Sequence, residues 1–149
     1  MEKVKYREGY KYQIVADYSI QTEICPPADI VTLYARLTAK GLLTLRAGYA
    51  WDGASGPAVD TPDFIRPSLV HDGFYNLMRD GLLDLGWREE ADRLLQRLFT
   101  EDAKKVKRPW GTGWLKHLAP IRAWWIYRGV RLGGEGSAKW QEPVILEAP

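Results

Sequence analysis

Four polar residues of this chain have types and spacings that could do chemistry: His71, Asp72, Tyr75 and Asp92. His71 and Tyr75 are four residues apart in a segment that favours a helix, so they share one face. Asp92 lies beside the apolar stripe of a second expected helix, where a buried carboxylate needs a partner. If these helices pack antiparallel, that partner is His71. An aspartate that holds one imidazole nitrogen leaves the other nitrogen to act as a general base.

Asp72 follows the histidine and points to a neighbouring helix face, towards a glycine-rich segment that contains Trp51, Asp52 and Ser55. Carboxylates and loop carbonyls are the hard oxygen ligands that calcium takes. Such an ion could polarise an ester carbonyl while His71 activates water. We therefore predict Asp72 and Asp52 as metal ligands, calcium as the candidate cofactor, and Trp51, Asp52 and Ser55 as binding residues.

A structural interpretation stands beside this catalytic one. His71 and Asp92 would then be a buried pair that links two helices. Asp72 would be a solvated helix residue or the partner of Arg66 or Arg79. Asp52 would be a turn residue that bonds its own backbone.

The elements that must position these residues follow from hydrophobic patterning. Residues 1–50 are expected to be mainly β, because apolar and polar residues alternate from residue 10 to residue 20. Cys25-Pro26-Pro27 interrupts the pattern. Two more strand-like runs, 30–37 and 42–49, flank a hairpin turn at 39–41, in which Gly41 can take a positive φ.

Helices are expected after the glycine- and proline-rich loop at 51–63. The first runs to about Met78, the second covers 88–105 and the third about 115–132. The short connection at 81–86 favours antiparallel packing of the first two. Residues 134–149 are expected to form an extended tail. The prediction is a single α+β domain over 1–149, with a small N-terminal antiparallel sheet followed by about three helices, the helical part spanning 64–133.

Composition excludes several classes of protein. With 21 basic and 19 acidic residues, the net charge is too small to bind nucleic acid by electrostatic attraction alone, so no nucleic-acid partner is expected. One cysteine, Cys25, excludes an internal disulfide framework. We expect neither a signal peptide nor a transmembrane helix, because no window reaches roughly 18 apolar residues.

Tryptophan is concentrated in the second half of the chain, which contains six of the seven residues of this type. The third expected helix mixes aromatic residues with arginines, among them Trp124 and Arg128. One interpretation is a surface that binds phospholipid or a membrane interface. A second is a core helix whose aromatic side chains cover the sheet. Trp110 and Trp114, beside a basic stretch, could instead contact a protein partner.

Two motifs, His71-Asp72-Gly73-Phe74-Tyr75 and Ala91-Asp92-Arg93-Leu94-Leu95, resemble the active-site helices of phospholipase A2. The resemblance covers about a quarter of the chain. It implies His71 as the base, Asp92 as the acid that orients it, Tyr75 as a hydrogen-bonding support and Asp72 as a calcium ligand. The chain departs from those enzymes in two ways: it lacks their disulfides, and 51–57 is not an obvious copy of their calcium loop.

A longer resemblance, over about residues 40–133, is to a mostly phage-encoded family of unknown function. Its pattern is similar to the segment 48–57, then to 71–75, then to Ala91-Asp92, and finally to Tyr127, Val130, Arg131 and Gly133. It implies a phage or prophage protein, located in the host bacterial cytoplasm or in the phage particle.

Three functions therefore remain open, one of which is a fold that a bound cation stabilises without catalysis. The first is a calcium-dependent, phospholipase A2-like hydrolase of lipid esters. The second is a non-enzymatic virion, tail or accessory protein that binds other phage proteins. The sequence does not give the oligomeric state.

Overall fold

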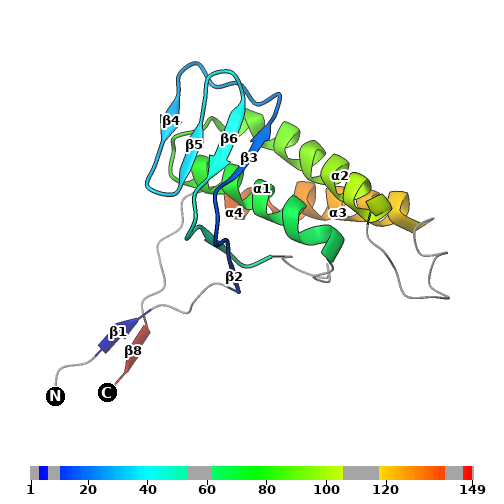
Figure 1. Ribbon diagram of the computed structural model, residues 1–149. Helices are drawn as coiled ribbons and strands as arrows, with labels where there is room; N and C mark the ends of the chain where they lie inside the picture. Colours follow the sequence, from blue (N-terminus) through cyan, green and yellow to red (C-terminus); the bar gives the residue numbers. More distant parts are fainter. Residues whose placement is uncertain (1–3, 7–10, 54–61, 106–117, 140–145, 149) are drawn as a thin grey trace.

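The computed structural model describes residues 4–6, 11–53, 62–105, 118–139 and 146–148 (Figure 1). The N-terminal half forms antiparallel β-structure and the second half forms helices, which confirms the α+β prediction. The main sheet has four strands in the order β3-β6-β5-β4, namely β3 (Tyr18–Gln21), β6 (Leu42–Leu45), β5 (Ala35–Leu37) and β4 (Ile30–Val31). Two shorter pairs join β2 (Tyr12–Gln13) to β7 (Ala50–Trp51) and β1 (Val4–Tyr6) to β8 (Leu146–Ala148).

The hairpin between β5 and β6 turns at Gly41, as predicted. Gly41 has a φ of +81°, and a Cβ atom there would lie 2.3 Å from the carbonyl oxygen of Thr22. Only glycine fits both conditions. The hairpin is therefore fixed by local backbone geometry as well as by its strand pairing.

The strand-like runs are shorter than predicted because turns interrupt them. The run 30–37 is split into β4 and β5 where the Thr32 hydroxyl bonds the backbone of Ala35. The run 42–49 ends as β6 at Leu45. Likewise, the alternating segment 10–20 is divided into β2 and the start of β3. Hydroxyl-to-backbone bonds of this kind compete with strand pairing.

Helix α1 (Pro62–Arg79) covers one face of the main sheet. Gly73 allows the close approach, since a Cβ atom there would lie 3.0 Å from a methyl group of Leu45. Phe74 and Leu77 are buried beside Leu43 and Leu45 in the same core. The sheet therefore positions the helix that carries His71 and Asp72.

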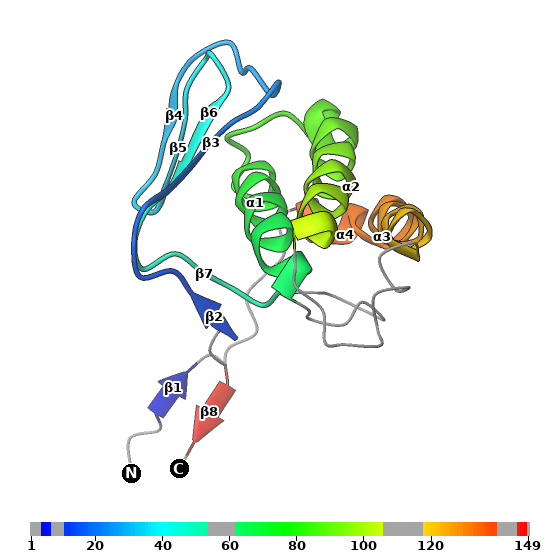
Figure 2. The same ribbon diagram turned by 45° about the vertical axis from the view of Figure 1, so that its right-hand side comes forward.

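Helix α2 (Arg88–Lys105) runs antiparallel to α1, as predicted, after a short turn and a 3-10 segment, η1 (Leu85–Trp87). Helix α3 (Ala119–Gly133) packs along α2, and Figure 2 shows the sheet, α1, α2 and α3 in that order. The part of the third predicted helix at 115–117 lies outside the described residues. The prediction of an extended tail from residue 134 is wrong for the short helix α4 (Glu135–Ala138). None of the helices that the structure describes is long and apolar enough to span a bilayer.

Candidate active site

A buried histidine–aspartate pair joins α1 to α2. His71 Nε2 lies 2.8 Å from Asp92 Oδ1. Asp92 has no exposed surface and His71 retains 8% of its surface. The predicted contact between the two helices therefore exists, and it is made at hydrogen-bonding distance.

Asp92 of α2 has hydrogen-bonding partners on two other helices, α1 and α3. The Tyr75 hydroxyl donates at 2.6 Å to Asp92 Oδ1, the oxygen that His71 also contacts. Nη1 of Arg131 on α3 donates at 3.2 Å to Asp92 Oδ2. Arg88 of α2 donates to the Tyr75 hydroxyl at 3.2 Å and to the carbonyl of Arg131 at 2.6 Å. Every partner of Asp92 is a donor or can act as one. Such a set stabilises the ionised carboxylate, which is an acceptor only.

The charge on Asp92 fixes the tautomer of His71. An acceptor-only carboxylate requires Nε2 to carry the proton, so Nδ1 of a neutral imidazole has a lone pair. Tyr75 stacks against the imidazole, with ring centroids 4.0 Å apart. Burial and the neighbouring Asp92 carboxylate both raise the pKa of the Tyr75 hydroxyl, so this side chain stays a donor over the whole working range. Such an orientation is what a histidine general base requires.

Asp72 is half-buried at the next position along α1, on a different face. Burial raises the pKa of its carboxyl to about 6, the charges of His71 and Arg79 oppose this change, and the charge of Asp52 adds to it. Asp52 and Asp72 are therefore close enough to interact. Functional sites often contain a buried acid whose charged form is destabilised in this way.

The predicted metal ligands supply two carboxylates. Oxygen ligands of this kind fit a hard cation such as calcium, which takes six to eight oxygens. Within the part of the chain that the structure describes, no group of three or more acidic, histidine or cysteine residues comes together to hold a metal. Asp52 and Asp72 would be two of the ligands, and a bound cation would supply Lewis acidity beside His71.

The predicted binding residues of the loop have different positions. Trp51 is buried, where its indole donates to the Ser68 hydroxyl at 3.1 Å and its ring packs on Tyr12. Asp52 Oδ1 accepts from the backbone amide of Lys11 at 3.3 Å. Trp51 thus anchors β7 to α1 and so holds Asp52 near Asp72. Ser55 lies outside the described residues.

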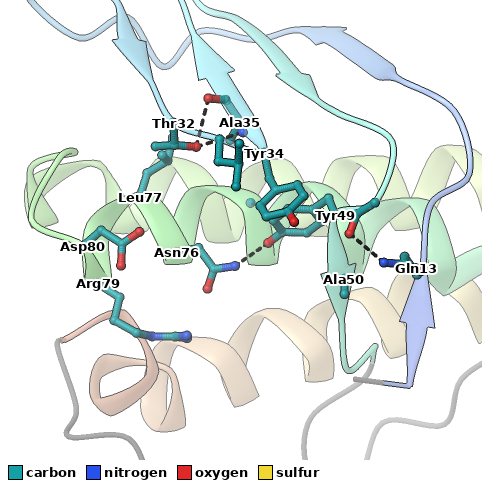
Figure 3. Close-up of a pocket in the computed structure, with 13 residues that line it drawn as sticks. Gln13, Thr32, Tyr34, Ala35, Tyr49, Ala50, Asn76, Leu77, Arg79 and Asp80 are labelled. Carbon is teal, nitrogen blue, oxygen red and sulfur yellow. Dashed lines mark hydrogen bonds between the residues drawn. The ribbon is translucent and has the colours of Figure 1, made fainter. Parts of the chain in front are cut away.

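A groove of about 540 Å³ opens beside the same helix (Figure 3). It lies between the C-terminal half of α1 and the turns that lead into β5 and β7. Its polar walls are held in place: Asn76 Nδ2 donates to the Tyr49 hydroxyl at 2.5 Å, and Gln13 Nε2 donates to the carbonyl of Gly48 at 2.9 Å. Gly73 lines the groove and His71 does not. The groove therefore lies on the side of α1 that faces the sheet, away from the side on which His71 meets α2.

Trp124 and Arg128 lie on the solvent side of α3 and do not contact His71 or Asp92 through any bond that the structure describes. The guanidinium of Arg128 is 5.7 Å from the centroid of the Trp124 ring. Both side chains are exposed. The interpretation of α3 as a core helix whose aromatic side chains cover the sheet is thus wrong for Trp124, and the buried face of α3, which includes Ala123, packs on α2 instead of the sheet.

Two arginines of the site were not singled out by sequence reasoning as its members. Arg131 was part of the late motif only, and Arg88 opens α2 without any distinctive pattern. Their roles depend on how α3 docks onto α1 and α2. The buried Asp92 was the available signal, since a charge in a core calls for a cationic partner.

Comparisons of the chain with protein-family models, with curated protein sequences and with solved structures find no match. Function is therefore argued from the site itself.

Proposed function

We propose that this chain is a hydrolase of lipid esters in which His71 is the general base. Asp92 orients the imidazole, and Tyr75 and Arg131 hold Asp92. The observation that supports the proposal best is the 2.8 Å contact between His71 Nε2 and a fully buried aspartate. The choice of a lipid ester rests on the resemblance of these two helices to phospholipase A2.

In the proposed reaction, Nδ1 of His71 takes a proton from a water molecule as the water attacks the ester carbonyl, and the imidazolium returns this proton to the alcohol oxygen as the acyl C–O bond breaks. The charge that develops on the imidazole is stabilised by Asp92, whose second oxygen is held by Arg131. A calcium ion held by Asp52 and Asp72 would polarise the carbonyl. His71 is 8% exposed, so we propose that substrate reaches it over this small opening, beside the half-buried Asp72.

The test is release of fatty acid from phosphatidylcholine vesicles, in calcium and in chelator, by the wild type and by His71→Asn. Calcium-dependent release that His71→Asn lacks would support the proposal. A matched control is Asn76→Ser, which alters the same helix one turn further on without touching Asp92. The proposal fails if the folded wild type releases no fatty acid, or if His71→Asn is as active as the wild type.

A second candidate is favoured by the number of partners around Asp92. Three donors from two helices, α1 and α3, meet on one buried carboxylate of α2, as they would in a structural junction. In this proposal the protein is a non-enzymatic phage component, and its tryptophan- and arginine-rich second half binds a partner. Strong destabilisation by His71→Asn, together with no hydrolysis by the wild type, would favour this candidate.

A further inference from the structure

An unusual stripe of large apolar side chains is exposed along the outer face of α3. It consists of Ile121, Trp124, Trp125 and Leu132, with exposed fractions of 54%, 49%, 65% and 79%. With steps of about 100° per residue, these side chains and Arg128 fall within roughly 100° of the helix circumference. Exposed apolar residues are common singly, but a continuous stripe marks an interaction site.

The stripe is separate from the packing of the fold. The opposite side of α3 supplies Ala123, Ile126 and Val130 to the core formed with Phe99 of α2. The two tryptophans are arranged edge to face, with ring centroids 5.2 Å apart, which gives one broad aromatic surface. Helix α3 thus has two apolar faces. The inner face is covered by α2, and the outer face is exposed to solvent.

Charge decides what kind of partner fits. The helix contains three arginines and no acidic residue. Arg122 and Arg131 form ion pairs with the buried Asp63 and Asp92, at 3.6 and 3.2 Å. Arg128 belongs to the outer face, where its side chain lies over the Trp124 ring. The stripe therefore combines aromatic rings with a positive charge and carries no negative one.

We propose that the outer face of α3 docks on the surface of an anionic lipid bilayer. Tryptophan rings favour the depth of the lipid headgroups because they are apolar with one polar edge, and an arginine can bury its stem while its guanidinium reaches the phosphates. A second copy of the chain fits less well. A two-fold interface would place this acid-free face against itself, and α3 would offer Arg128 no counter-ion.

The test measures binding of the full chain to vesicles of phosphatidylcholine mixed with phosphatidylglycerol, by co-sedimentation in chelator. The double variant Trp124→Ser/Trp125→Ser should bind at least about tenfold more weakly, because the loss of each indole ring removes a large apolar area from the contact with the bilayer. Arg128→Gln should lose binding to the mixed vesicles and change little with phosphatidylcholine alone. Val15→Ser, another exposed apolar residue, is the matched control and should bind like the wild type.

The inference is overturned if the wild type does not bind the mixed vesicles, or if the double variant binds them equally well. It is also overturned if sizing shows a wild-type dimer that the double variant splits, because a second copy would then cover the stripe. The substituted side chains are exposed, and matching melting temperatures verify that the variants fold. Binding is measured without hydrolysis, so vesicle binding by a chain with no esterase activity supports this inference while the hydrolase proposal fails.

Discussion

Replacing Asp72 with asparagine should stabilise the protein at pH 8 and leave its stability at pH 4 nearly unchanged. Burial raises the pKa of Asp72 from 3.8 to about 6 in the folded chain. The folded state therefore holds this proton more tightly than the unfolded state does, and stability falls as the pH rises through this interval. A shift of about 2 units corresponds to an upper limit of about 3 kcal/mol. Screening at a half-buried position reduces the expected gain to about 1–2 kcal/mol.

The assay is urea unfolding of the wild type and Asp72→Asn at several pH values between 4 and 8, in chelator. The difference in unfolding free energy should grow over this range and then level off above about pH 6. Asp80→Asn serves as the control, because Asp80 is an exposed acid just beyond the end of α1. A variant that is less stable than the wild type at pH 8, or a difference independent of pH, would refute the reasoning. Added calcium should stabilise the wild type more than Asp72→Asn if this carboxylate is a ligand.

The remaining predictions concern single substitutions, each measured by urea unfolding. Gly41→Ala should lower the free energy of unfolding by about 2 kcal/mol or more. The new Cβ atom would meet the carbonyl oxygen of Thr22, in a backbone conformation that only glycine adopts readily. A loss of less than half of this value would argue against a fixed turn. Gly73→Ala should cost about 1–3 kcal/mol by pushing α1 away from two leucines of the sheet, and an unchanged stability would mean that the helix can shift freely. Trp51→Phe should cost about 1–3 kcal/mol through the loss of the buried bond to Ser68, and its effect should be absent if that bond is not formed in solution.

The helix pair was predictable from sequence because its information is local. Apolar periodicity gave the bounds of α2, and the spacing of His71, Tyr75 and Asp92 gave the faces that meet. A buried charge has few permitted partners, so a single aspartate in an apolar stripe specified the contact between the two helices.

The parts that sequence reasoning missed depend on contacts between distant segments. Pairing of β1 with β8 joins the two ends of the chain, and neither strand has a strong pattern of its own. The ion pair between Arg131 and Asp92 exists only because α3 docks along α2. The exposed stripe on α3 was ambiguous for the same reason, since a helix with apolar residues around most of its circumference does not show which face the fold will cover.

The measurement that tests the catalytic arrangement most directly is the tautomer of His71, read from nitrogen NMR of the imidazole. The chain has two histidines, so His71→Asn assigns the signals without ambiguity. The proposed base requires a neutral imidazole with the proton on Nε2, and Asp92→Asn should weaken this preference. A proton on Nδ1 in the wild type would contradict the account, because Asp92 would then not be the acceptor that leaves Nδ1 available to activate water.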